Sequence, residues 1–78
     1  MKKSIWDDSY NKLRKELKRI RKNAGLTQKQ LAELLEKPQS YVSKYEIGDR
    51  NLDLIEFINV CKACNEKPEV FIDRLGIV

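Results

Sequence analysis

The chain has 78 residues, a length that favours one domain whose core is near the lower size limit for stability without disulfides or metals. Its composition, 41% hydrophobic and 36% charged, excludes a disordered chain, and no apolar run approaches the roughly 18 residues of a membrane helix. The formal charge is +4, and residues 1–30 contain ten Lys and Arg against three acidic residues. This basic segment suits a polyanionic partner, although the same residues can simply form the solvated face of a helix.

Helical spacing dominates the first third of the chain, where apolar residues recur at steps of four, three, four and three: Trp6, Tyr10, Leu13, Leu17 and Ile20. Ser4 can cap the start of this helix, and Gly25 supplies a left-handed residue just after its end. Trp6 and Tyr10 are expected in the core, with a partner-binding groove as the alternative.

A capping box opens the second helix, because the Thr27 side chain can accept from the backbone of Gln30 while Gln30 reaches back. The expected inner face of this helix consists of Leu31, Ala32 and Leu35. Pro38 stops its continuation, and a third helix is expected over about 39–46, with Val42 and Tyr45 inward.

A second capping box, formed by Asp53 and Glu56, predicts the fourth helix. Its expected core face contains Leu54, Phe57, Ile58, Cys61 and Cys64. Pro68 marks the first turn of a short fifth helix, which carries Phe71, Ile72 and Leu75 and ends at Gly76. The short connections leave no room for a linker, so a compact all-α bundle of five helices forming a single domain over 1–78 is predicted.

Cys61 and Cys64 form a Cys-x-x-Cys pattern, which raises the question of zinc or redox chemistry. A structural zinc site needs four ligands, and this chain has no His and no other Cys. Core packing is therefore the expected role, with an inter-subunit Cys₄ site or a redox switch as alternatives. Without His or a phosphate-binding loop, the sequence predicts neither an enzyme nor a cofactor.

The strings GLTQKQLA and PQSYVSKYE, followed by Gly48, Arg50 and Asn51, resemble the Cro/C1-type (XRE) helix-turn-helix family of phage repressors and bacterial regulators. The resemblance covers roughly Leu13 to Leu75. It implies a five-helix bundle of the lambda-repressor type, with the motif at about 27–47 and the third helix in the major groove of double-stranded DNA.

The resemblance also implies which side chains contact DNA. Gln39, Ser40 and Lys44 would face base edges, with Ser43 at the margin. A Gln amide can pair with adenine, and a Lys ammonium can donate to guanine. Expected phosphate contacts are Thr27, Gln28, Tyr41, Arg50 and Asn51; these set register and affinity rather than sequence preference.

In related repressors, the residues matching Arg21 and Glu46 form a partly buried ion pair, and a phosphate-binding Arg21 is the alternative. Glu36 stands where the family usually has Gly. If the turn keeps a left-handed residue there, the side chain costs on the order of 1 kcal/mol; otherwise the second helix runs longer. Lys37 replaces the usual apolar turn residue, so the tilt of the third helix is left open.

The function expected from these features is sequence-specific DNA binding by a cytoplasmic transcriptional regulator, a repressor acting as a homodimer on an inverted-repeat operator. The expected dimer region spans about 55–78 and includes Ile55, Val60, Val70, Ile77 and Val78. The alternative is a protein-interaction module on the same fold, such as the antitoxin of a toxin–antitoxin pair or a co-regulator.

Overall fold

The computed structural model describes the backbone of residues 5–76 and the side chains of residues 8–76. Within this range the chain forms five helices: α1 Ile5–Asn23, α2 Gln28–Leu35, α3 Gln39–Ile47, α4 Leu54–Ala63 and α5 Pro68–Leu75. The all-α fold predicted from the sequence is confirmed. None of the described helices is both long enough and apolar enough to cross a membrane.

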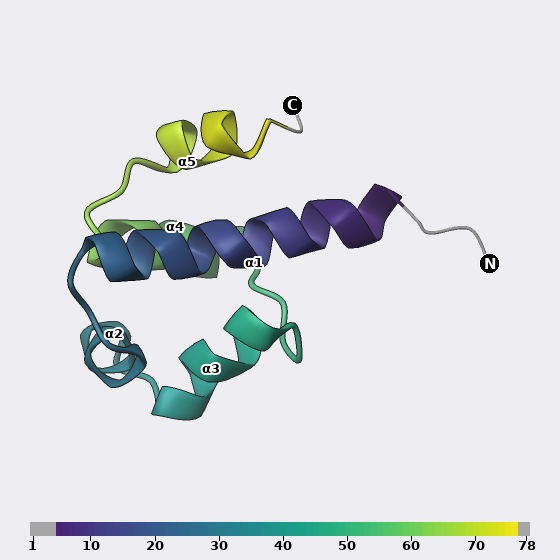
Figure 1. Ribbon diagram of the computed structural model, residues 1–78. Helices are drawn as coiled ribbons and strands as arrows, with labels where there is room; N and C mark the ends of the chain where they lie inside the picture. Colours follow the sequence, from purple (N-terminus) through teal and green to yellow (C-terminus); the bar gives the residue numbers. More distant parts are fainter. Residues whose placement is uncertain (1–4, 77–78) are drawn as a thin grey trace.

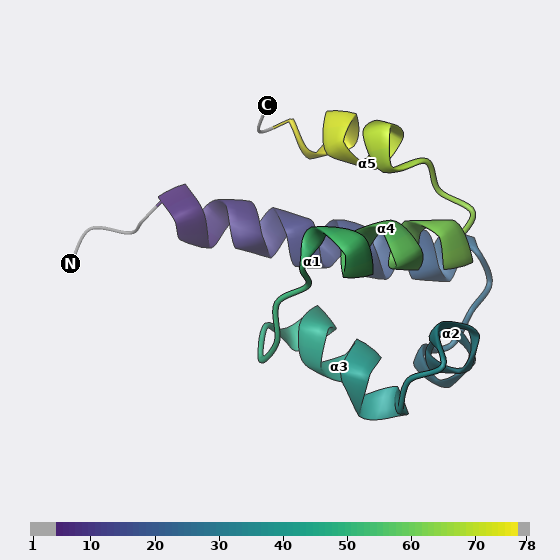
Figure 2. The ribbon, with the colours of Figure 1, turned by 180° about the vertical axis from the view of Figure 1, so that it is seen from behind.

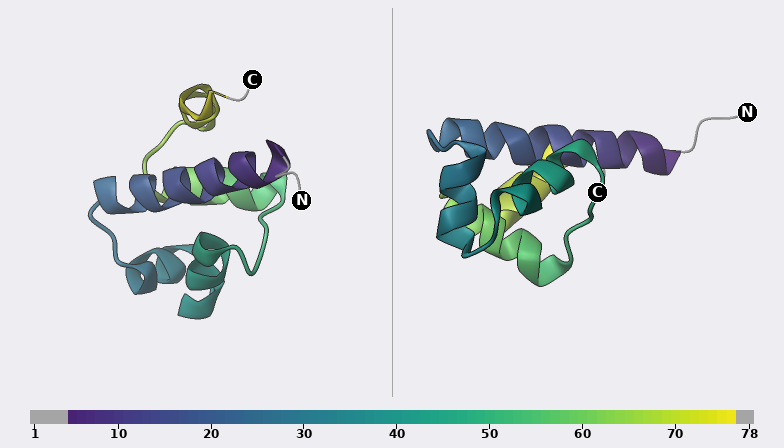
Figure 3. Two further views of the ribbon diagram at one scale, coloured as in Figure 1. Left: turned by 45° about the vertical axis from the view of Figure 1, so that its right-hand side comes forward. Right: turned by 90° about the horizontal axis from the view of Figure 1, so that it is seen from below.

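The helices form three tiers (Figures 1 and 2). α1 and α4 lie at the same middle level in these views, although the view from below separates them (Figure 3), with α5 on one side of that level and α2 and α3 on the other. The tiers are in contact, since α2 packs on α3 and α4, while α5 packs on α1 and α4. α3 is therefore an outer helix, with one side against the bundle and the other side facing away from it.

Both predicted capping boxes are confirmed. The Gln30 backbone N–H donates to Thr27 Oγ1 at 3.0 Å, and the Thr27 N–H donates to Gln30 Oε1 at 2.9 Å. At α4, the Glu56 N–H donates to Asp53 Oδ1 at 2.8 Å, and the Asp53 N–H donates to Glu56 Oε1 at 2.9 Å. These bonds satisfy N–H groups that the first helical turn leaves without partners, and they fix where both helices begin.

The core is built around the corner between α2 and α3. Ala32 is 1% exposed and Val42 is fully buried, as expected if a small residue on α2 allows α3 to approach closely. From the other side, Phe71 of α5 packs edge-on against Phe57 of α4, with ring centroids 4.9 Å apart. The buried cluster comprises Leu17, Ile20, Leu31, Ala32, Tyr41, Val42, Tyr45, Val60, Cys61, Cys64, Phe71 and Leu75.

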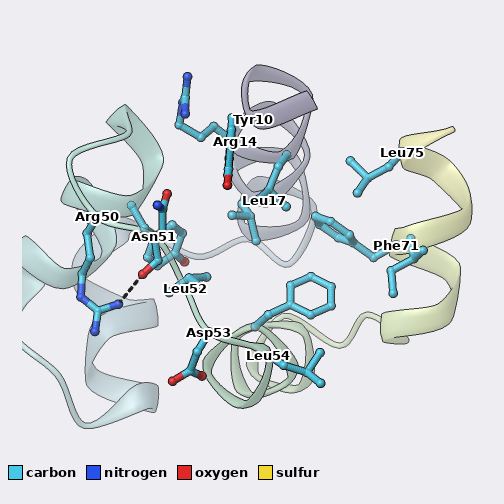
Figure 4. Close-up of a pocket in the computed structure, with 14 residues that line it drawn as sticks. Tyr10, Arg14, Leu17, Arg50, Asn51, Leu52, Asp53, Leu54, Phe71 and Leu75 are labelled. Carbon is cyan, nitrogen blue, oxygen red and sulfur yellow. Dashed lines mark hydrogen bonds between the residues drawn. The ribbon is translucent and has the colours of Figure 1, made fainter. Parts of the chain in front are cut away.

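Three residues expected in the core are exposed instead: Tyr10 at 44%, Leu54 at 67% and Ile72 at 37%. All three line an open apolar groove of about 310 Å³ at the end of the bundle where α4 begins (Figure 4). Helical periodicity places them on inward faces, but none of the helices within residues 5–76 covers that end. The side chain of Trp6, which the sequence placed on the same face of α1, lies outside the described residues.

Val60 corrects the expected dimer surface, because it is fully buried in the core. Val60 lies on α4, which packs against α2 on one side and α5 on the other. Two faces of α4 are therefore covered, whereas a helix in a two-layer bundle has only one covered face. The same burial encloses both thiols. Burial raises the pKa of Cys61 to about 12 and that of Cys64 to about 11, so both stay protonated at neutral pH and pack as small apolar groups.

Candidate nucleic-acid interface

The turn between α2 and α3 keeps the left-handed residue. Glu36 has φ 58° and ψ 44°, its N–H donates to the Glu33 carbonyl at 3.1 Å, and the Lys37 N–H donates to the Ala32 carbonyl at 2.9 Å. This is the Schellman arrangement that usually has Gly at the left-handed position. α2 therefore ends at Leu35, and the turn adopts the strained alternative, at a cost on the order of 1 kcal/mol.

One face of α3 is open and polar. Gln39, Ser40 and Lys44 are exposed, and Ser43 is half-buried, with its hydroxyl donating to the Ser40 carbonyl at 3.2 Å. Residues at these spacings share one side of a helix, while Val42 and Tyr45 occupy the opposite side against the core. The view from below the bundle shows α3 crossing beside α2 on this outer surface (Figure 3).

A buried ion pair joins this helix to α1. Arg21 Nε donates to Glu46 Oε2 at 2.8 Å and Arg21 Nη2 to Glu46 Oε1 at 3.2 Å, with side chains 8% and 3% exposed. A third donor, Arg21 Nη1, bonds the Leu26 carbonyl at 2.9 Å, and the hydrogen bond to Glu46 raises the pKa of Arg21. These contacts leave Arg21 enclosed and directed inward, so it does not act as the phosphate ligand considered as the alternative.

Gln28 also bonds Glu46, with Nε2 donating to Oε1 at 2.9 Å. The Glu46 carboxylate of α3 therefore binds α1 through Arg21 and α2 through Gln28, the first residue of that helix. Gln28 remains half-exposed at the start of α2, where backbone N–H groups and the helix dipole favour an anion. Among the described residues, its side chain bonds Glu46 and not Gln39.

Tyr41, which the sequence led us to expect at a phosphate, is only 9% exposed. Its ring meets that of Tyr45 edge-on, with centroids 5.8 Å apart, and burial is the main cause that raises its pKa. The guanidinium carbon of Arg50 lies 4.6 Å from the ring centroid, and Lys37 Nζ lies 5.5 Å from it. The spacing of four between Tyr41 and Tyr45 is the sequence signal that indicates a shared, buried face.

Arg50 is already paired within the protein. Its Nη2 donates to Glu56 Oε2 at 2.7 Å, and its Nη1 donates to Glu56 Oε1 at 3.1 Å and to the Asn51 carbonyl at 3.0 Å (Figure 4 shows the last bond). Sequence reasoning assigned Glu56 only to the α4 cap and missed this second role. Thr27 and Asn51, the remaining expected phosphate contacts, are exposed.

Comparison with known proteins agrees with this geometry. A family model described as helix-turn-helix matches residues 17–71. A solved structure described as an XRE-family like protein from Pseudomonas syringae pv. tomato str. DC3000 is 40% identical, with a TM-score of 0.87 over 92% of this chain and 88% of that chain. No protein with a curated description matches the chain. The chain belongs to the Cro/C1-type (XRE) helix-turn-helix family of DNA-binding domains.

Proposed function

We propose that this DNA-binding domain is a transcriptional repressor that acts as a homodimer and recognises an inverted-repeat operator. The observation that supports the proposal best is the division of α3 into a buried face and a polar outer face. The ion pair between Arg21 and Glu46 fixes that helix to the bundle, so its outer side chains meet DNA in a defined orientation.

In the proposed complex, Gln39, Ser40 and Lys44 read base edges in the major groove, and Ser43 contacts its margin. The Gln amide both donates and accepts, which suits adenine, whereas the ammonium only donates, which suits the guanine acceptors. All three side chains are exposed and can therefore reorient without breaking core contacts.

Thr27, Gln28, Arg50 and Asn51 are the proposed phosphate contacts. Gln28 keeps its amide oxygen and one N–H beyond the bond to Glu46, and it stands beside the free N–H groups of the first turn of α2. Tyr41 is assigned an indirect role, because its buried ring supports Arg50 from below.

The proposed dimer surface lies on α4 and α5, within the region of about 55–78. Ile55 is 65% exposed and Val70 is 44% exposed, which is unusual for large apolar side chains unless they pack against another molecule. Ile77 and Val78, also expected at this surface, lie outside the described residues. A two-fold dimer presents two copies of α3 to two half-sites, and this symmetry is the basis for proposing an inverted repeat.

Selection of bound duplexes from a random pool tests the proposal. The wild-type chain should enrich two inverted half-sites whose centres are about one DNA turn, roughly 34 Å, apart. Gln39→Ala and Lys44→Ala should each cost about 1–3 kcal/mol and relax the preference at particular base pairs. Lys62→Ala removes a charge that is also exposed, from α4, and should leave the selected sequence unchanged. Equal weakening on every duplex would refute the base-reading roles.

The apolar groove at the end of the bundle supports the second candidate function, a protein-interaction module such as an antitoxin or co-regulator. Tyr10, Leu54 and Ile72 present a hydrophobic surface there, beside Arg50 and Asn51, which also line the groove. Binding to random duplex DNA across a salt series separates the two candidates. A steep loss of affinity with salt supports DNA binding, whereas no binding at low salt supports the protein partner.

A further inference from the structure

The guanidinium of Arg50 is held on three sides. The Tyr41 ring lies beneath it, with the guanidinium carbon 4.6 Å from the ring centroid. The Asn51 carbonyl accepts from Nη1 at 3.0 Å, and the Glu56 carboxylate takes one bond from each terminal nitrogen, at 3.1 and 2.7 Å. A side chain that the family resemblance assigns to phosphate is thus part of a built contact in the free protein.

The bonds to Glu56 and Asn51 occupy one edge of the Arg50 guanidinium, and the donors on another edge stay available. Arginine has five N–H donors, and the bonds to Glu56 and Asn51 use both of those on Nη1 and one of those on Nη2. The Nε–H and the second Nη2–H have no acceptor among the described residues. These two donors form a fork that matches two oxygens of one phosphate.

Glu56 is itself fixed in place. Its Oε1 accepts the Asp53 N–H at 2.9 Å, and its own N–H donates to Asp53 Oδ1, so the capping box of α4 holds the carboxylate. The hydrogen bond from Arg50 is the main cause that lowers the pKa of Glu56 to about 2, and the bond from the Asp53 backbone adds to it. At neutral pH the carboxylate is ionised and offsets the charge of Arg50.

We propose that Glu56 is a positioning residue that neutralises Arg50 and fixes its orientation, and thereby reduces sequence-independent binding to phosphates. The proposal rests on the DNA binding proposed above. An unpaired arginine attracts any phosphate within its reach, whatever the sequence. An arginine that is paired and stacked points its two remaining N–H donors in one direction only. It therefore contributes to DNA affinity chiefly when α3 lies in the major groove in the correct orientation.

Glu56→Gln tests this proposal, because Gln can still accept the Asp53 N–H and keep the cap while the countercharge is lost. Asp49→Asn is the matched control: it removes the same charge from an exposed residue adjacent to Arg50, and Asp49 forms no ion pair within the described part of the chain. Affinity for a random duplex is measured from 50 to 200 mM salt. A fully released charge adds up to about 0.9 to the log–log salt slope, which is an additional loss of about 3.5-fold over this range.

Glu56→Gln should therefore bind random duplex more tightly at low salt, show the steeper slope, and discriminate less between selected and random sequences. Asp49→Asn should change the slope less. Equal slopes for the two variants would overturn the proposal, because Glu56 would then act only as one negative charge among others. Far-UV circular dichroism of each variant shows whether the fold is kept.

Arg50→Gln gives a second test, and the salt slope of this single variant does not depend on the Glu56 variant folding. If Glu56 already offsets the charge of Arg50, the loss of Arg50 should lower the salt slope by less than half of 0.9; a fall of the full amount would overturn the proposal. Adding Glu56→Gln to the Arg50→Gln variant should then steepen its salt slope by no more than Asp49→Asn steepens the slope of the wild-type chain. A wild-type chain that binds no DNA at low salt would refute the proposed function, whereas normal wild-type binding with unaltered variants refutes only the role of Glu56.

Discussion

Truncation of Glu46 is the most direct test of how α3 is held. Glu46→Ala removes the acceptor of two Arg21 bonds, at 2.8 and 3.2 Å, and of the Gln28 bond at 2.9 Å. It leaves a guanidinium that is only 8% exposed without its countercharge. Breaking a buried pair from one side typically costs about 3–5 kcal/mol, and a chain of this length has roughly 4–12 kcal/mol of stability in total. We therefore expect the variant to lose at least a quarter of its stability.

Urea unfolding followed by far-UV circular dichroism measures this loss, provided that the slope of the free energy of unfolding against urea is unchanged. Replacing both partners, as Arg21→Met with Glu46→Leu, should recover most of the stability, because no buried charge then remains. A cost below about 1 kcal/mol for Glu46→Ala would refute the reasoning, since that is the value of a solvated surface pair. A double variant no more stable than the single one would refute it as well.

The other predictions concern backbone strain and acid stability, and unfolding curves measure all of them. Gly25 and Gly48 both have positive φ, but a Cβ at Gly48 would also lie 3.1 Å from the Arg14 guanidinium, so Gly48→Ala should destabilise more than the roughly 1 kcal/mol expected for Gly25→Ala. Glu36→Gly should stabilise by up to about 1 kcal/mol by relieving the left-handed strain; no gain would mean that the turn relaxes. Because the pKa of Glu56 is lowered to about 2, its stabilising contribution is present above about pH 4.5 and is lost as pH falls towards 2. Glu56→Gln should flatten that part of the curve of stability against pH, and an unchanged curve would contradict the assignment.

The helix boundaries could be predicted because their signals are local. Thr27 and Asp53 cap helices through residues three positions away, so the sequence alone contains both partners. The corner between α2 and α3 could also be predicted, because Ala32 and Val42 combine helical spacing with suitable sizes. Each of these features involves only a few residues, and predicting it does not require knowing which helices pack together.

The errors occur where burial depends on several helices at once. Val60 was expected at a dimer surface but is fully buried, because α2 and α5 cover α4 from two sides. Leu54 has the correct periodicity but lies at an end that none of the five described helices covers. The burial of Tyr41, which the resemblance places at a phosphate, follows from its spacing of four from Tyr45, against which its ring packs. Periodicity identifies one face of a helix, whereas the number of covered faces depends on the assembled bundle.

The tilt of the recognition helix, which the unusual turn sequence left open, is set by contacts outside the turn. Near the C-terminal end of α3, Glu46 binds α1 and α2 through Arg21 and Gln28. Near its N-terminal end, the Tyr41 ring lies under Arg50, which Glu56 ties to α4. α3 is thus attached to α1, α2 and α4 by polar groups at both ends and by apolar packing between them. This arrangement explains how a turn with a strained Glu and no apolar anchor can still hold α3 firmly against the bundle, as the proposed base reading requires.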